Sequence, residues 1–500
     1  MIHRGGAMTR FVLFWLAGLA AIGAFACTAA RLATPGGETE LGDDAAVAVE
    51  RQIGLVHTPP EIAGYVKAIG ARLVKDPAVR ADVAYRFEIV DMAEPNAFAL
   101  PGGFIYVSRG LLAVLNSEDE LASVIGHEVG HVAAHHHLRH AMMETPLLPV
   151  RLAAGLGGLA TGIVSPGLGK IVSGVGSAPG SLTLATHSRA QEDEADEIGQ
   201  KLVADAGWDP RAMATVMDAL SREAELAGRD PNRHGFLDTH PTTPARSRST
   251  LERAATLQVA QIAPIVPDRR RFYERLDGLL YGAPASHGVV VDGEFLHPDL
   301  DLRIAFPDAW KVENAPQSVV AAPESGDAVA VFTIAAEGND PSAVANEVVR
   351  KASLEVEGRV EPTRIGGFDA ARVSARSREG WSTRYHHLIA WIHQGGVIYQ
   401  IAGTTLEGNW SRHQDAISRT VESIRPLGPA DRRRVHEARL RIVEAQRGET
   451  LAALLERVGS AWSPERAAAA NGIAANAALQ PGQALKVACF EIYAPTQSPR

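Results

Sequence analysis

The stretch His127-Glu128-Val129-Gly130-His131 decides how the chain around it is interpreted. Its two histidines are four residues apart, so on a helix they lie one turn apart on the same face, where both imidazoles can reach one metal ion. Glu128 lies beside them and has the chemistry of a general base. The flanking sequence predicts the helix, because Ser117 and Glu120 form a capping box and apolar residues recur at helical spacing.

A third ligand is expected further along the chain, because a catalytic zinc ion takes three protein ligands and keeps one position open for water. Glu192 fits this role from a second predicted helix, residues 189–206. Asp196 is one turn further along the same face, and we expect it to accept a hydrogen bond from a ligand histidine and so fix that ring. An ordinary solvated acidic helix face is the alternative, but the upstream motif favours a zinc site of His127, His131 and Glu192.

More histidines follow the motif on the same predicted helix: His135, His136, His137 and His140. They face several directions. We interpret them as a solvated or packed helix end rather than as metal ligands.

Three segments in this order resemble the metallopeptidase family that includes the CAAX prenyl endopeptidase and the bacterial protease HtpX: Asn96–Gly103, His127–His131 and Glu192–Asp196. The resemblance covers residues 43–282 and is closer to soluble periplasmic BepA-type proteases than to membrane-embedded members. It implies a mainly helical zincin-type peptidase domain with a small sheet, one zinc ion per chain, and cleavage of misfolded or unassembled envelope proteins. On this resemblance, strand Phe104–Val107 is the sheet edge to which an extended polypeptide substrate adds.

The same resemblance singles out His240, because Thr239-His240-Pro241 with Arg246 beyond it resembles a motif near the family's active site. His240 either stabilises the oxyanion during catalysis or binds zinc as a fourth ligand and keeps the enzyme latent. A histidine in a plain surface turn is the remaining alternative.

Composition bounds these interpretations. The chain has 500 residues, 46% of them hydrophobic, which predicts several domains rather than one core. Its formal net charge of −9 argues against a nucleic-acid partner, which would need a basic face. Its 2 cysteines, Cys27 and Cys489, predict no disulfide framework.

The N-terminal residues 1–26 have the features of an export signal: basic residues precede an apolar run that is short for a membrane-spanning helix. The run ends in Ala24-Phe25-Ala26-Cys27, which resembles a lipobox and would make Cys27 a lipidated anchor in the outer membrane. Ordinary cleavage after Ala26 and an uncleaved anchor are the alternatives. We expect a periplasmic protein, with residues 27–42 as a flexible tether.

Beyond the peptidase segment, strand-like runs and two helices predict an antiparallel α+β module of unknown role at residues 288–426. Residues 146–180 are interpreted as two short packed helices rather than as a lid. The α+β module contains tryptophans that we interpret as core residues rather than as a ligand surface: Trp310, Trp381, Trp391 and Trp410.

Residues 437–490 resemble a LysM module, through Gly448-Glu449-Thr450-Leu451 and Pro481-Gly482-Gln483. The resemblance implies a separate βααβ unit that binds peptidoglycan, and a single copy that only completes the architecture is the alternative. The chain is thus predicted to be multidomain α+β and to act as a zinc-dependent endopeptidase. The competing hypothesis is a peptidoglycan-binding envelope protein whose peptidase domain is latent or a scaffold.

Overall fold

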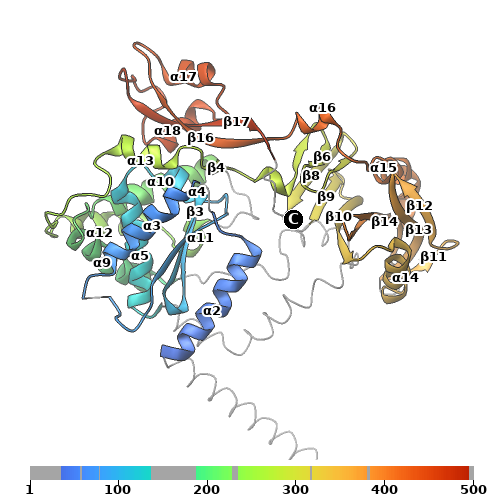
Figure 1. The fold of residues 1–500 in the computed structure, drawn as a ribbon, viewed down its shortest axis with the longest axis horizontal. Coiled ribbons are helices and arrows are strands. Elements are labelled where there is room, and N and C mark those ends of the chain that lie inside the picture. Colours follow the sequence, from blue (N-terminus) through green and yellow to red (C-terminus); the bar gives the residue numbers. More distant parts are fainter. Residues whose placement is uncertain are drawn as a thin grey trace, which may run out of the picture. The chain divides into compact units, whose positions relative to one another are not determined.

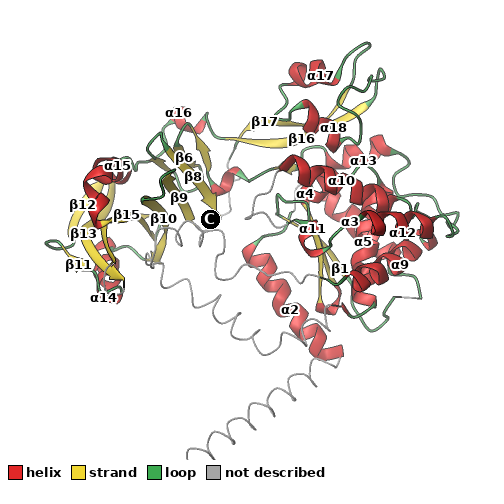
Figure 2. Ribbon diagram, turned by 180° about the vertical axis from the view of Figure 1, so that it is seen from behind, coloured by secondary structure: helices red, strands yellow, loops and turns green. Residues whose placement is uncertain are grey.

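The computed structural model describes residues 35–56, 59–77, 79–136, 187–227, 235–315, 318–379 and 383–494. These residues form two compact units of a multidomain α+β protein (Figures 1 and 2). Unit 1 holds the described residues up to Gly282 together with Ala438–Phe490, and unit 2 holds Ala283–Glu437 and the last described residues. The expectations for the export signal, Cys27, the helices at 146–180, His137, His140 and Trp381 lie outside the described residues.

Unit 1 consists mainly of helices around a three-stranded sheet with strand order β1-β3-β2. Its strands are β1 (Arg86–Val90), β2 (Ala97–Leu100) and β3 (Phe104–Ser108), with the 3-10 turn η1 (Pro101–Gly103) between the last two. Its helices are α2 (Pro35–Gln52), α3 (Pro60–Leu73), α4 (Arg109–Val114), α5 (Glu118–Ala133), α9 (Arg189–Asp205), α10 (Ala212–Ala227), α11 (Phe236–Thr239), α12 (Pro244–Ala254) and α13 (Arg269–Leu276).

The edge of this sheet differs from the sequence prediction. β3 pairs with β1 on one side and with β2 on the other, so it is the central strand. Within the segment Asn96–Gly103, residues Ala97–Leu100 form a strand antiparallel to β3. Gly102 and Gly103 have positive φ angles of 78° and 87°, which reverse the chain between the two strands. The prediction that Phe104–Val107 is the sheet edge is therefore wrong, and β1 and β2 are the edge strands of this sheet.

The predicted tether is also shorter than expected, because α2 begins at Pro35 within residues 27–42. Glu38 on α2 is buried, and both of its carboxylate oxygens accept hydrogen bonds from Arg80, at 2.9 and 2.8 Å. Gly42 faces Pro101 so closely that an added Cβ would lie 2.0 Å from the Pro101 carbonyl oxygen. These contacts hold the helix against η1 and rule out a free linker over its residues.

Glycines bring α5 and α9 unusually close together. A Cβ added to Gly130 would lie 2.6 Å from the carbonyl oxygen of Ala195, and one added to Gly199 would lie 2.8 Å from the amide nitrogen of His127. Both distances are shorter than real Cβ atoms tolerate. The close approach of the two backbones therefore depends on glycine, and it places Glu192 and Asp196 against the helix that carries the histidine motif.

The C-terminal segment has the predicted order of elements, β16 (His436–Glu444), α17 (Leu451–Val458), α18 (Pro464–Ala470) and β17 (Ala484–Ile492). Its strands join β4 (Leu280–Tyr281) in a sheet with order β17-β16-β4. The sequence predicted a separate unit here, but residues 438–490 belong to unit 1. Leu454 and Leu485 share one hydrophobic core with residues of the peptidase segment.

A buried lysine reinforces this packing. Lys486 is fully buried, and its side-chain nitrogen donates hydrogen bonds to the carbonyl oxygens of Ala113 and Leu115, at 2.8 and 2.5 Å. These carbonyl groups lie at the end of α4, just before α5 begins. The C-terminal segment is thus fastened to the connection that leads into the motif helix.

Unit 2 is an antiparallel α+β module, as predicted. Its large sheet has the path β11-β13-β14-β15-β10-β9-β8, and β12 pairs with β13. The members of this sheet are β8 (Trp310–Ala315), β9 (Ser318–Pro323), β10 (Ala328–Glu337), β11 (Glu355–Val356), β12 (Glu361–Ile365), β13 (Phe368–Glu379), β14 (Thr383–Gln394) and β15 (Val397–Leu406). The other elements are η3 (Ala285–His287), β5 (Val289–Val291), β6 (Glu294–His297), β7 (Leu302–Ala305), α14 (Pro341–Lys351), η4 (Glu407–Asn409), α15 (Trp410–Glu422) and α16 (Pro429–Arg432).

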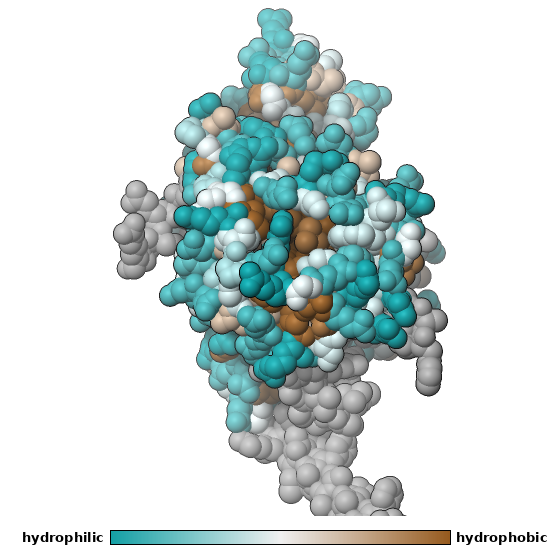
Figure 3. Space-filling view, turned by 90° about the vertical axis from the view of Figure 1, so that its right-hand side faces the viewer, coloured by the Kyte–Doolittle hydropathy of each residue, from teal (hydrophilic) through white to brown (hydrophobic). Residues whose placement is uncertain are grey.

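Alternation along β14 shows how helices cover this sheet. Ile389 and Trp391 pack in one cluster with Ala345 of α14, whereas Ala390 and Ile392 pack in another with residues of α15. Since successive residues of a strand point to opposite faces, α14 and α15 cover opposite faces of the sheet. The full burial of Trp391 agrees with its interpretation as a core residue. On the face shown in Figure 3, hydrophilic residues dominate and apolar residues gather near the centre.

No helix in the described ranges is both long and apolar enough to cross a membrane.

Candidate metal centre

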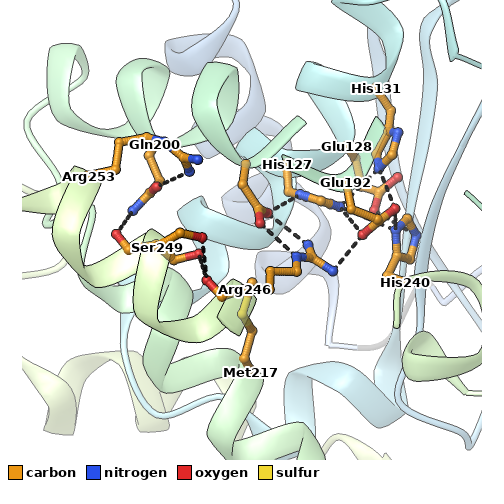
Figure 4. Close-up of polar contacts among 12 residues, drawn as sticks. His127, Glu128, His131, Glu192, Gln200, Met217, His240, Arg246, Ser249 and Arg253 are labelled. Atoms are coloured by element: carbon orange, nitrogen blue, oxygen red, sulfur yellow. Dashed lines mark hydrogen bonds and ion pairs between the residues drawn. The ribbon is translucent and has the colours of Figure 1, made fainter. Parts of the chain in front are cut away.

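Four buried side chains from three parts of unit 1 converge on one point (Figure 4). His127 and His131 come from α5, Glu192 from α9, and His240 directly follows α11. One donor atom of each lies within 4.8 Å of the donors of the other three. The structure thus brings together the three predicted zinc ligands and the histidine whose role the sequence left open.

The distances between donor atoms fit a tetrahedral ion. His127 Nε2 lies 3.0 Å from His131 Nε2 and 3.2 Å from His240 Nδ1. Glu192 Oε1 lies 2.9 Å from His240 Nδ1 and 3.3 Å from His131 Nε2. Bonds of about 2.0–2.1 Å to a tetrahedral zinc ion separate neighbouring donors by roughly 3.3 Å. Three imidazole nitrogens and one carboxylate oxygen are also a donor set that zinc accepts, so these residues fit zinc.

Asp196 lies where the sequence placed it, one turn beyond Glu192 on α9. Its Oδ1 is 2.9 Å from His127 Nδ1, on the side of the ring away from the other donors. Arg246 on α12 holds the same carboxylate with two hydrogen bonds of 2.7 and 2.8 Å and lies 2.6 Å from Glu192 Oε2. One buried guanidinium therefore fixes both acidic residues, a function that the sequence did not indicate.

The charges of this cluster favour exchange of protons for a metal ion. Burial opposes protonation of His127, but Asp196 and Glu192 outweigh it and raise the pKa of His127 to about 9. Burial also opposes ionisation of Glu192, yet its histidine contacts hold the pKa of that carboxyl far below its usual value. Glu192 is therefore an anion, and a cation that replaces the proton on His127 satisfies the same anions.

Glu128 is fully buried next to the four donors. Burial raises the pKa of its carboxyl above the usual value. Within the described part of the chain, neither carboxylate oxygen has a hydrogen-bond partner. The Nε2 of His240 lies 3.5 Å from Glu128 Oε1. A carboxylate with a raised pKa and no fixed partner is suited to accept and release a proton.

The segment that carries His240 is held from several sides. The ring of His240 stacks on Phe236 at a centroid distance of 4.4 Å, and its amide donates to the Phe236 carbonyl oxygen at 2.8 Å. The Phe236 amide in turn donates to Pro95, just before β2, at 2.9 Å. Only 2% of His240 is exposed, which excludes a plain surface turn.

Two further histidines belong to this region: His136, which the sequence suggested as part of a solvated or packed helix end, and His187, which it did not single out. His136 is fully buried and contacts His131, so it is a packed helix end that touches a predicted ligand. The ring of His187 lies 4.0 Å from that of His131, and burial lowers the pKa of His187 to about 3. A histidine five residues after the motif was a usable signal for His136. The sequence around His187 held none, because a contact so distant along the chain has no local pattern.

Comparison with known proteins finds relatives of the part of the chain that carries this geometry. Residues 60–254 match Peptidase family M48. The Beta-barrel assembly-enhancing protease of Escherichia coli (strain K12) is 29% identical over 220 residues, which are 44% of this chain and 44% of that protein. The Mitochondrial metalloendopeptidase OMA1 of Arabidopsis thaliana is 35% identical over 171 residues, 32% of this chain and 30% of the relative. The Metalloprotease LoiP of Escherichia coli (strain K12) is 30% identical over 167 residues, 33% of this chain and 62% of that protein.

The chain thus spans less than half the length of the first of these relatives. The similarity lies in the region that carries all four donors, Glu128 and Asp196. The part of the chain that carries the donor cluster, residues 60–254, is thus similar to Peptidase family M48.

Proposed function

We propose that this protein is a zinc-dependent endopeptidase that hydrolyses peptide bonds of envelope proteins, in particular misfolded or unassembled ones. The observation that carries the proposal is the buried cluster of His127, His131, Glu192 and His240 with the unpartnered carboxylate of Glu128 beside it. The substrate class is supported by the Beta-barrel assembly-enhancing protease, whose name describes an activity in the assembly of barrel proteins.

The chemistry divides between the cofactor and the chain. When bound, zinc acts as a Lewis acid that lowers the pKa of water and polarises the scissile carbonyl group. Glu128 takes the proton of the attacking water and later delivers it to the leaving amine. Asp196 and Arg246 keep the ring of His127 in place, and the closed walls around Glu128 keep bulk water from competing for the proton.

The edge strand β2 is the proposed docking site for an extended substrate. Phe98 and Leu100 pack in a cluster with residues of α2, and Ala97 and Ala99 pack in the cluster that includes α5. Both faces of the strand are thus covered, and its hydrogen-bonding edge opposite β3 is the side that a substrate strand can join. β2 also lies against α5, the helix that carries Glu128, which brings this edge strand to the general base.

We further propose that the described conformation is a closed form in which His240 is the fourth zinc ligand. Its Nδ1 belongs to the donor cluster, at 3.2 Å from His127 Nε2 and 2.9 Å from Glu192 Oε1. A site with four protein ligands has no open position for water, so His240 has to leave before catalysis. After leaving, the same imidazole can stabilise the oxyanion.

The sequence-based expectations about the envelope stay predictions. They are a periplasmic location, an outer-membrane lipid anchor at Cys27, and peptidoglycan binding by residues 437–490. The order of elements β16, α17, α18 and β17 is compatible with the LysM resemblance.

The test of the enzymatic proposal is Glu128→Gln, which removes the base and keeps the shape of the side chain. We expect the purified variant to keep about one zinc per chain and to lose roughly 10²- to 10⁴-fold of its cleavage rate on an unfolded protein substrate. Glu197→Gln, at an exposed position on α9, is the matched control and should cleave like the wild type. Undiminished cleavage by Glu128→Gln would contradict the mechanism.

A further inference from the structure

The two histidines of the motif have different partners behind them. His127 has the carboxylate of Asp196 at 2.9 Å from its Nδ1. The Nδ1 of His131 instead lies 2.9 Å from the Nδ1 of His136, and the Nε2 of His136 lies 3.2 Å from Glu194 Oε2. His131 is thus backed by a second imidazole and, behind that, by a carboxylate at the surface.

The end of α5 explains why His136 is placed there. Ala134 is the C-cap of α5, and His135 follows with a positive φ of 58°, the left-handed conformation that ends many helices. The His135 amide donates to the Val132 carbonyl oxygen at 3.0 Å, which is one of the hydrogen bonds of a Schellman motif. In that motif the residue after the left-handed one folds back onto the last turn of the helix. His136 is that residue, and His131 lies in that last turn.

The hydrogen bonds fix the position of each proton. If His131 presents Nε2 to the donor cluster, its proton is on Nδ1, and that N–H donates to His136 Nδ1. His136 then carries its own proton on Nε2 and donates it to Glu194. Each ring has one donor and one acceptor in use, so neither ring can turn over without breaking a hydrogen bond.

We propose that His136 is a positioning residue that holds His131 in the ring orientation and tautomer needed to bind zinc, through the relay His131–His136–Glu194. The inference rests on the proposed function, since it assigns zinc to His131. Full burial of His136 strengthens it, because water cannot replace the acceptor that His131 uses. Partners of this kind typically change metal affinity by about 10- to 100-fold.

Two substitutions of similar shape test the acceptor atom of His136, its Nδ1, separately from the rest of the side chain. In His136→Asn, the amide oxygen takes the place of Nδ1 and can still accept from His131. In His136→Gln, the amide takes the place of Nε2, which preserves the contact with Glu194 and removes the acceptor that faces His131. His136→Ala removes both. His135→Gly is the neighbouring control, since glycine favours the positive φ of that position.

The experiment measures the zinc dissociation constant of the full chain by competition with a chromogenic chelator, with circular dichroism as the check of folding. We expect His136→Gln and His136→Ala to bind zinc about 10- to 100-fold more weakly, and His136→Asn and His135→Gly to stay within about threefold of the wild type. If the Ala variant does not fold, the Asn and Gln pair decides.

Wild-type affinity in a folded His136→Gln overturns the relay, as does an equal loss in His136→Asn and His136→Gln. Either result leaves the enzymatic proposal intact, because the wild-type chain then still binds zinc. A wild-type chain that binds no zinc refutes the proposed function first and the relay with it.

Discussion

His240 illustrates how single residues decide what this site can do. It is the one member of the donor cluster that is not on a helix of the peptidase core, since it is the C-cap of the four-residue helix α11. The residues just before it are tied to other segments by hydrogen bonds from the Phe236 amide to the Pro95 carbonyl oxygen and from the His187 amide to the Thr239 carbonyl oxygen. A ligand on so short a segment can be released without unfolding α5 or α9.

We predict that His240→Ala removes one imidazole from the zinc coordination. X-ray absorption spectroscopy of the zinc-loaded wild type should show three imidazole ligands and one carboxylate, and the variant should show two imidazoles. Zinc affinity should fall by about tenfold or more, since even indirect partners of a ligand have effects of that size.

The control is His436→Ala, which removes an exposed histidine from the same chain and should change neither quantity. Two imidazole ligands in the wild type would show that His240 stays off the metal and would leave oxyanion stabilisation as its role.

At the residue scale, the sequence was informative where spacing along a helix determines contact. Two pairs of residues are each one helical turn apart: His127 with His131, and Glu192 with Asp196. In the structure three of them lie in the donor cluster, and Asp196 contacts His127. Arg246 and His187 reach the same place from other segments. Their contacts arise only when α9, α11 and α12 pack together, and no local pattern records that packing.

At the scale of elements, the crossing of α5 and α9 is the central feature. The crossing brings the carboxylates of one helix to the imidazoles of the other. It relies on Gly126 facing Gly199 and on Gly130 facing Ala195. Because these positions have no side chains, the backbones of α5 and α9 are in direct contact. The separation of the two helices, and with it the distance between the ligands that they carry, is therefore determined by backbone atoms rather than by flexible side chains.

Gly199→Ala tests this dependence. Its Cβ would lie 2.8 Å from the His127 amide nitrogen and 2.9 Å from Gly126, so the helices have to separate. We expect the free energy of unfolding in urea to fall by about 1–3 kcal/mol, the usual range for overpacking, and zinc binding to weaken with it.

Gly64→Ala on α3 is the matched control, because an added Cβ there has nothing within 4 Å. Helix propensity predicts that it is neutral or stabilises by up to about 1 kcal/mol. Equal effects of the two substitutions would show that the crossing tolerates a side chain.

The sheet shows what the sequence could not supply at this scale. The apolar run Phe104–Val107 correctly predicted a strand, but every residue of β3 is buried, as expected for a central strand. The tertiary fold determines which strands pair in the sheet, and hydrophobicity alone does not distinguish a buried edge strand from a buried central strand. The C-terminal segment shows the same limit of local patterns. The sequence predicted the order of its elements correctly, but it did not predict that the segment packs into unit 1.

At the scale of the whole molecule, unit 2 is an insertion into unit 1. The chain leaves unit 1 after β4 and returns in β16, and these two strands pair antiparallel, with Tyr281 opposite Ala438. The exit and the return are therefore neighbours in one sheet. Insertions with adjacent ends can be removed with little disturbance to the host domain.

We predict that unit 1 survives the excision of unit 2. Replacing residues 282–437 with Asn-Gly converts β4 and β16 into a hairpin with a two-residue turn. The shortened protein should keep the zinc affinity of the full chain and a cooperative thermal transition, both measured on the purified protein.

Deletion of the C-terminal segment is the comparison for the excision of unit 2. Truncation after Glu437 removes Leu454, Leu485 and Lys486 from the unit 1 core and leaves the carbonyl groups of Ala113 and Leu115 without this donor. It should lower the midpoint of thermal unfolding by many degrees, because a loss of 1 kcal/mol alone corresponds to about 2–4 °C. A truncated chain as stable as the excised one would show that the C-terminal segment is dispensable.

The pairing of β4 with β16 also sets an order in time. A ribosome that has finished β4 adds the whole of unit 2 before it reaches Ala438, which takes roughly 10 to 30 s at 5–20 residues per second. During this interval the residues of the motif helix have been made, but those of the segment that anchors the connection before it have not. Unit 1 can therefore be completed only after Ala283–Glu437 of unit 2 have been made.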